Sequence, residues 1–286
     1  MKVYDCFPFY NEFDLLEIRL EELWDVVDYF VIAEADKTHQ HNPKPYYLSE
    51  NWDRVKKYES KIRVVKVDDM PNHPNTWVGE KHQRRSLIKG LWDRQPDDLI
   101  CTSDCDEIPR AEAIAAIKED ANDYNRYILG MPMFYFKLNF MQIHPHPRQR
   151  HIVVTRGRSY IDPQAEREFT FYKDNHPTID YSTNSVMLDH AGWHFTYFGD
   201  DDFARNKLKN FAHAESNVPE IVDNVNLDYM IANKVGFMGF NHAERFEYIR
   251  FDDYFPEYVI KNQEKYKDKI ILNATHSVDE FYPMSK

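Results

Sequence analysis

Three carboxylates lie within four positions in the segment Ser103-Asp104-Cys105-Asp106-Glu107-Ile108-Pro109, the segment of this chain that is most informative about its chemistry. The apolar run at 98–102 predicts a buried strand directly before them, and Pro109 predicts the start of a helix after them. Side chains at the carboxyl end of such a strand lie where open α/β sheets bind ligands, and carboxylate oxygens suit Mg²⁺ or Mn²⁺. We therefore expect Asp104 and Asp106 to hold a divalent ion that can bridge two phosphate groups. The alternative is an acidic turn stabilised by the dipole of the following helix.

A second candidate segment, at 189–199, contains His194 between aromatic residues. The small pair Ala191-Gly192 permits a close approach of the backbone, and the residues after it predict a strand. A neutral imidazole in that strand can complete a metal shell begun by carboxylates. The alternative is a hydrogen-bonded histidine of the core.

Composition limits the classes of protein to which the chain can belong. Its 286 residues include 36 Lys and Arg against 48 Asp and Glu, a net charge of −12, which disfavours general binding to nucleic acid or to anionic membranes. The three cysteines form no disulfide framework and fit a reducing compartment. No run approaches the roughly 18 apolar residues of a membrane span, and no signal peptide is recognised at the start. We expect a soluble, cytoplasmic protein.

The elements that must position these residues alternate along the first third of the chain. Strand-like stretches alternate with helix-like stretches, and this alternation predicts βαβ units and a mainly parallel sheet. The second half changes character, with a β-rich run, then a polar stretch that we expect to be irregular, then a strand and further helices. The predicted elements are strands at 2–9, 29–33, 62–67, 98–102, 126–140 and 192–198, helices at 52–59, 80–92, 202–214, 225–234 and 256–267, a helix opened by Asn11-Glu12, and an irregular stretch at 141–190.

Several of these segments together resemble glycosyltransferase family 17, which includes N-acetylglucosaminyltransferases. Each segment alone is weak, but they run in the family's order over nearly the whole chain. The matching segments are 3–12, 26–34, Gln83-Arg84, 103–109, 191–194, Lys207-Leu208, and Pro256-Glu257-Tyr258 with Asn262.

The resemblance implies a GT-A type α/β fold with a Rossmann-like, mainly parallel central sheet flanked by helices. It also implies a nucleotide-sugar donor, either UDP-GlcNAc or another UDP-sugar, a divalent metal, Mn²⁺ or Mg²⁺, and an inverting reaction. We expect a single catalytic domain over 1–286. Residues 1–120 would hold the nucleotide-sugar and the metal, and residues 121–286 would face the acceptor.

The same resemblance assigns roles to particular residues. Asp104, Asp106 and His194 are the expected metal ligands, and Asp104 and Trp193 are also expected to contact substrate. Glu34 follows a strand and could contact uridine or ribose, unless it is only an exposed acid at a strand end.

Gln83 and Arg84 open a helix face from which a guanidinium can meet a diphosphate, and the alternative is a set of solvated or ion-paired arginines. Glu215 is the expected general base, with Asp106 as the second catalytic residue; the alternative for Glu215 is a surface acid on a helix. The next candidates for the base are Glu166, Glu168 and Asp189.

We therefore predict a metal-dependent inverting glycosyltransferase that acts on a glycan or another hydroxyl acceptor. The segment 141–180 departs from the family pattern, which leaves the acceptor open. A metal-dependent phosphoester hydrolase and a non-catalytic sugar- or nucleotide-binding module are the alternatives. A hydrolase would release phosphate or nucleotide without sugar transfer, and a binding module would release no UDP.

Overall fold

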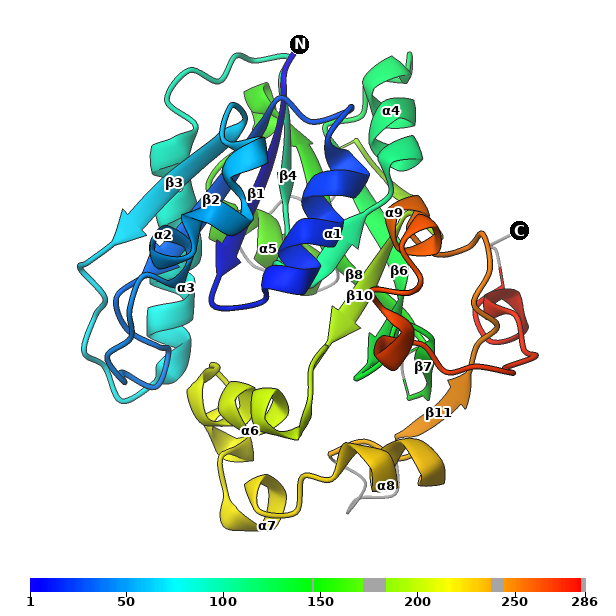
Figure 1. Ribbon diagram of the computed structural model, residues 1–286. Coiled ribbons are helices and arrows are strands. Elements are labelled where there is room, and N and C mark those ends of the chain that lie inside the picture. The colour runs from blue at the N-terminus through cyan, green and yellow to red at the C-terminus, as the bar shows by residue number, and fades with distance from the viewer. Residues whose placement is uncertain (146, 172–183, 238–243, 284–286) are drawn as a thin grey trace.

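Four parallel strands, in the order β3-β2-β1-β4, form one side of the sheet. They are β1 (Val3–Phe9), β2 (Tyr29–Ala35), β3 (Ile62–Val67) and β4 (Leu99–Thr102). The computed structural model describes residues 1–145, 147–171, 184–237 and 244–283 (Figure 1). Because the four strands are parallel, their carboxyl ends meet at one edge of the sheet, where the loops that follow them lie close together.

The side chains of β1 alternate between two cores, one on each face of the sheet. Val3 and Phe7 pack with α1 (Phe13–Leu23) on one face. Tyr4 and Cys6 pack on the other face, with residues of the turn that follows α3 (Thr76–Ser86). This two-sided burial produces the near-continuous apolar runs from which these strands were predicted.

Helix α1 lies between two cores. Leu16 and Leu20 face the sheet, whereas Leu15 and Ile18 pack into a second cluster that includes Val259 of α9 (Glu257–Lys261). The hydroxyl of Tyr258 in α9 donates to Glu17 of α1 at 2.6 Å. The first helix, α1, is therefore covered by residues from the last tenth of the 286 residues.

The second half of the chain extends the sheet mostly with antiparallel pairs. Strand β8 lies antiparallel between β4 and β6, and β10 pairs in parallel with β6 and antiparallel with β5. The predicted α/β class of GT-A type is confirmed, with the parallel pairs concentrated in the first four strands. The added strands are β5 (Glu107–Pro109), β6 (Arg126–Tyr135), β7 (Phe140–His144), β8 (Arg148–Arg156), β9 (Ser185–Leu188), β10 (Gly192–Thr196) and β11 (Arg245–Tyr248).

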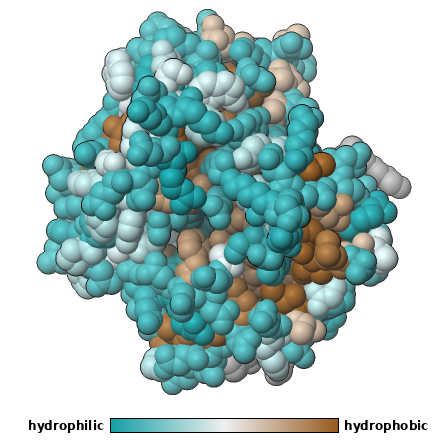
Figure 2. Space-filling model, viewed as in Figure 1, coloured by the Kyte–Doolittle hydropathy of each residue, from teal (hydrophilic) through white to brown (hydrophobic). Residues whose placement is uncertain are grey.

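Helices α6 (Asp201–Asn210), α7 (Pro219–Val222) and α8 (Leu227–Asn233) lie beyond the carboxyl ends of the parallel strands (Figure 1). Ala204 and Leu208 of α6 pack into an aromatic cluster with Phe136, Phe140 and Phe246. Hydrophobic residues visible on this face gather mainly in its lower half, where these elements lie (Figure 2). The remaining helices are α2 (Tyr47–Glu50), α4 (Ala111–Glu119) and α5 (Pro163–Phe171).

Four predicted elements differ from the structure. The described parts of the stretch 141–190 are not irregular, since they contain β8, α5 and β9, whereas residues 146 and 172–183 lie outside the described residues. No helix begins at Pro109, because 107–109 pairs with β10 as strand β5 and α4 begins at Ala111. The predicted helix 256–267 is helical only at Glu257–Lys261, and 52–59 forms two 3-10 turns rather than a helix.

No helix among the described residues is long and apolar enough to cross a membrane.

Candidate active site

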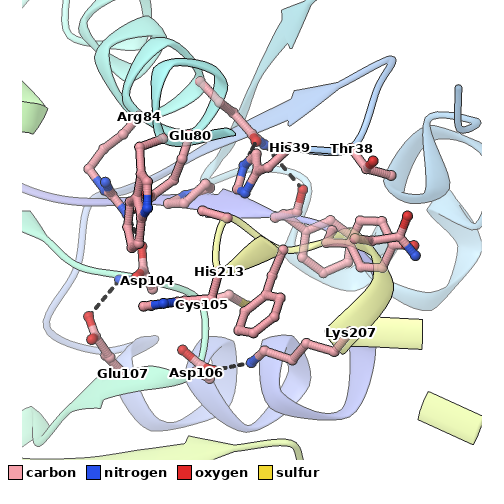
Figure 3. Close-up of a pocket in the computed structure, with 18 of the residues that line it drawn as sticks. Thr38, His39, Glu80, Arg84, Asp104, Cys105, Asp106, Glu107, Lys207 and His213 are labelled. Atoms are coloured by element: carbon pink, nitrogen blue, oxygen red, sulfur yellow. Dashed lines mark hydrogen bonds and ion pairs between the residues drawn. The ribbon is translucent and has the colours of Figure 1, made fainter. Parts of the chain in front are cut away.

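A cavity of about 820 Å³ opens at the carboxyl ends of the parallel strands. Its walls combine the acidic segment after β4 with residues of α3, α5, β10 and α6, so both halves of the chain contribute (Figure 3). Among the residues that line it are Phe9, Tyr10, Glu12, His39, Gln83, Arg84, Asp104, Asp106, Glu107, His151, Arg167, Glu168, His194, Tyr197 and Lys207.

Arg19 of α1 holds the main chain of the acidic segment from beneath. Its NH1 group donates to the carbonyls of Asp104 at 2.7 Å and Glu107 at 2.8 Å. Its other nitrogens pair with both oxygens of Asp5, at 2.6 and 2.7 Å, and both side chains are fully buried. A buried ion pair that also bonds the loop carbonyls fixes the direction in which the carboxylates point.

Both oxygens of Asp104 are paired with arginines. Arg84 donates to one oxygen at 2.8 Å and Arg167 to the other at 2.9 Å. Burial alone would raise the pKa of Asp104, but the charges of Arg167 and Arg84 outweigh it and hold that pKa below its ordinary value. The carboxylate is therefore ionised and keeps two guanidinium groups in the cavity.

Asp106 faces a lysine and a histidine. Lys207 of α6 lies 2.7 Å from one oxygen, a pair drawn in Figure 3. Nε2 of His194 lies 3.6 Å from the other oxygen. Burial opposes ionisation, yet Lys207 and then His194 lower the pKa of Asp106 below its ordinary value. Asp106 is therefore an ionised carboxylate, with the ammonium of Lys207 beside one oxygen and an imidazole nitrogen of His194 beside the other.

Glu107, His151 and His194 form a cluster in which one ligand atom of each lies within 4.8 Å of the others. Glu107 is the register partner of His194 between β5 and β10, and its carboxylate lies 3.0 Å from Nδ1 of His151. Nδ1 of His194 is buried with no hydrogen-bond partner among the described residues. Two imidazoles and carboxylates are a ligand set that suits a divalent metal, so these residues fit such an ion.

Close packing of β10 against β5 explains how His194 reaches this cluster. A Cβ atom on Gly192 would lie 2.6 Å from the carbonyl of Ile108, so a larger residue would push the two strands apart. Gly192 thus permits the close backbone approach that the sequence predicts.

The structure brings Gln83 and Arg84 into the cavity, as the sequence predicts. Gln83 donates to the carbonyl of Ala33 at 2.9 Å, and its side-chain oxygen lies 2.9 Å from Nε2 of His39. Burial lowers the pKa of His39, so the imidazole favours its neutral form.

Glu34 and Trp193 are placed outside the cavity lining. Glu34 is fully buried and accepts a hydrogen bond from the amide of Leu48 at 2.9 Å. The Trp193 indole donates to the carbonyl of Tyr254 at 3.1 Å and lies beneath the guanidinium of Arg110. Both side chains support the fold around the site rather than facing the cavity.

Glu215 also lies outside the cavity lining. It belongs to a short 3-10 turn (Ala214–Ser216), not a helix, and its largely exposed side chain pairs with His213 at 2.6 Å. Of the other predicted bases, Glu166 is buried against Arg126 and Asp189 contacts Tyr282. Among these four acids only Glu168 lines the cavity, because α5 places it there.

Sequence reasoning missed Arg19, His151 and Arg167. Arg167 pairs with both oxygens of Glu107, at 2.6 and 2.9 Å, from the stretch expected to be irregular. Each of these residues meets the acidic segment over 44 or more positions of sequence, so no local spacing reveals that contact. Arg167 could have been found through its neighbour Glu168, which was a predicted candidate for the base. Both lie in a helix whose charged residues point inward.

Comparison with known proteins gives a family match and partial relatives. The profile of glycosyltransferase family 17 matches residues 1–269. The human and rat enzymes named beta-1,4-mannosyl-glycoprotein 4-beta-N-acetylglucosaminyltransferase are each 31% identical over 116 residues. That match covers 38% of this chain and only 22% of each relative. The resemblance predicted from the sequence is confirmed.

Two solved structures resemble this one at low similarity. A mannosyltransferase from Pyrobaculum calidifontis, in complex with GDP-Man and Mn²⁺, has 10% identity and a TM-score of 0.36, covering 80% of this chain and 69% of that one. S. aureus TarS, residues 1–349, has 12% identity and a TM-score of 0.35, covering 81% and 72%.

Proposed function

This chain belongs to glycosyltransferase family 17, and we propose that it moves GlcNAc from UDP-GlcNAc to a hydroxyl of a glycan, with inversion and with the help of a divalent metal. The observation that carries the proposal is the meeting of three carboxylates, two imidazoles and three cationic side chains in one cavity. Residues from both halves of the chain build that centre, so the division at residue 120 separates donor from acceptor only in part.

Asp106 and His194 are the proposed metal ligands, and Glu107 and His151 are near enough to complete the shell. A bound Mn²⁺ or Mg²⁺ supplies stabilisation of the negative charge that develops on the leaving diphosphate. Asp104 contributes by holding Arg84 and Arg167 in the cavity, and its direct contact with metal stays a prediction.

Arg84 is the proposed contact for the diphosphate on the α3 side. Its Nε is buried and has no hydrogen-bond partner among the described residues, while its other nitrogens bond Glu80, Asp104 and Gln164. A guanidinium fixed in this way keeps a positive charge at the cavity wall, where it would attract a diphosphate. Gln83 and His39, which lie beside it, offer polar groups to the nucleoside.

The reaction forms a bond between the acceptor oxygen and the anomeric carbon and breaks the bond to the diphosphate oxygen. The electron pair leaves with UDP, and the proton of the acceptor hydroxyl passes to a carboxylate base. We assign that role to Glu168, because Lys81 and Gln164 both bond its Oε1 and thereby orient the carboxylate in the cavity. Glu215 does not line the cavity, so we do not retain it as the base.

The test of the function is a screen of UDP-sugars with Mn²⁺, with and without glycan acceptors, in which UDP release and the anomeric configuration of the product are measured. We expect transfer with inversion that stops in EDTA. UDP release without any glycosylated product would favour a hydrolase, and no UDP release from any donor would favour a binding module.

The test of the base is Glu168→Gln, with Glu12→Gln as the matched control from the same cavity. We expect Glu168→Gln to slow transfer by about 10²- to 10⁴-fold while UDP and metal affinities stay unchanged. Transfer at the normal rate would exclude Glu168.

A further inference from the structure

We propose that Lys207 of α6, which pairs with Asp106 in the structure, is a diphosphate-binding residue that moves to the donor when metal and donor bind. The inference builds on the proposed function and adds to it a residue from the far side of the cavity. It also assigns to α6 a direct part in donor binding.

The position of Lys207 suits this role. Its side chain is 16% exposed and reaches from α6 to the acidic segment after β4, as Figure 3 shows. Its Nζ lies 2.7 Å from Asp106 Oδ2 and 5.1 Å from the ring centre of Tyr197. The ammonium therefore lies inside the cavity, between the carboxylate and an aromatic wall.

The hydrogen-bonding capacity of Lys207 is only partly used. An ammonium has three donors, and within the described part of the chain Lys207 makes one hydrogen bond, to Asp106. Two donors thus remain in a largely enclosed place that borders the donor cavity. The oxygens of a diphosphate are acceptors that could take them.

The charges of the centre explain why Lys207 would move. Asp104, Asp106 and Glu107 carry three negative charges and pair with Arg84, Arg167 and Lys207, and Arg84 pairs with Glu80 as well. A divalent ion on Asp106 would add positive charge beside the ammonium, whereas a diphosphate brings negative charge. The balance is therefore kept when metal and diphosphate arrive together, with the ammonium turned from the carboxylate to the phosphate.

This arrangement makes two predictions of opposite sign for Lys207→Met. Without nucleotide, Mn²⁺ should bind more tightly, because the ammonium no longer competes for Asp106. With saturating Mn²⁺, UDP should bind about tenfold or more weakly, because a hydrogen bond to a charged group is lost. A lysine that only neutralised Asp106 would give the first change without the second.

The experiment is calorimetric titration of Mn²⁺ alone, and then of UDP at saturating Mn²⁺, on the whole chain. Lys209→Met is the matched control, since Lys209 is exposed on the same helix and the charge change is equal. It should leave both affinities unchanged. Lys207→Arg, which keeps a cation able to bond phosphate, should recover much of the UDP affinity.

The outcomes separate this inference from the function on which it rests. Wild-type protein that binds no UDP in the presence of Mn²⁺ would overturn the proposed function and this inference with it. Wild-type protein that binds UDP with Mn²⁺, together with unchanged UDP affinity in Lys207→Met, would overturn the role of Lys207 alone.

Discussion

Two sides of the cavity are built by different kinds of contact. The floor is the acidic segment 103–107 with Arg19 and Asp5 beneath it, joined by a fully buried ion pair. The roof is α6 with the turn that follows it, and it is joined to the parallel half by the Lys207–Asp106 ion pair and by polar side chains that donate to main-chain carbonyls. Gln40 bonds the carbonyls of Leu208 at 3.2 Å and Phe211 at 3.1 Å, and Thr76 bonds that of Ala212.

The floor is therefore the part of the cavity that positions the charged groups, and the roof is the part that can move. Removing one partner of a buried ion pair costs about 3–5 kcal/mol, whereas a typical hydrogen bond contributes about 1 kcal/mol net. The floor is therefore expected to stay fixed through a catalytic cycle. We expect the roof to be the part that moves when the donor enters, once Lys207 has left Asp106.

The largest effect is expected on the floor, from Arg19→Met. It leaves the Asp5 carboxylate buried without its partner and frees the carbonyls of the acidic segment. We expect the free energy of unfolding to fall by about 3–5 kcal/mol, measured by urea denaturation. Arg54→Met is the control, because its pair with Asp14 is half-exposed and should change stability by less than about 1 kcal/mol. Equal losses of unfolding free energy in the two variants would show that the buried pair of the floor stabilises the fold no more than a surface pair does.

Asp106→Ala comes next and separates chemistry from folding at the floor. Transfer should fall by at least about 10²-fold, because a metal ligand is lost, while the melting temperature should fall less than in Arg19→Met because Arg19 still holds the loop. Asp104→Ala should behave similarly, through the release of Arg84 and Arg167. Activity at half the wild-type value with saturating metal would contradict the assignment.

His151→Ala tests how far the metal centre extends beyond the predicted ligands. We expect metal affinity to fall by about 10- to 100-fold, and by at least as much for His194→Ala, with part of the activity restored by excess Mn²⁺. Direct titration of Mn²⁺ measures both. A normal affinity in His151→Ala would restrict the centre to Asp106 and His194.

The smallest effect is expected on the roof, from the double variant Gln40→Ala with Thr76→Val. Loss of these bonds should lower the unfolding free energy by about 1–3 kcal/mol and speed the release of UDP, which stopped-flow displacement would measure. Asn51→Ala, which removes a bond within one loop, is the control. Slower release in the double variant would show that the roof is not the part that yields.

The floor was more predictable from sequence than the roof, for physical reasons. Strands β1 to β4 were predicted because burial on both faces makes their apolar runs local signals. Asp104 and Asp106 were found because three carboxylates after such a run are also a local pattern. The predicted Glu215 failed to reach the cavity because its segment is a 3-10 turn at the surface rather than a helix.

Side chains that act over long sequence separations left no such signal. Helix α5 was missed because its charged residues point inward to Glu107 and Arg126, so it has no ordinary apolar stripe. Strand β5 was read as a helix start because Pro109 suits both, and only its pairing with β10 decides. Pairing between strands that lie far apart in the sequence depends on the topology of the whole sheet.

The position of α1 between two cores has a consequence for synthesis on the ribosome. Its outer face, with Leu15 and Ile18, is covered by residues near Val259 and Tyr266, which emerge when most of the chain is already made. Arg19 can meet Asp5 early, but the helix that carries it remains half-covered until then. Nascent chains that stop before this point would expose an apolar helix face, and chaperones recognise such surfaces. Full cover of the helix that supports the floor therefore waits for the translation of residues near Val259 and Tyr266, more than 200 positions after Arg19.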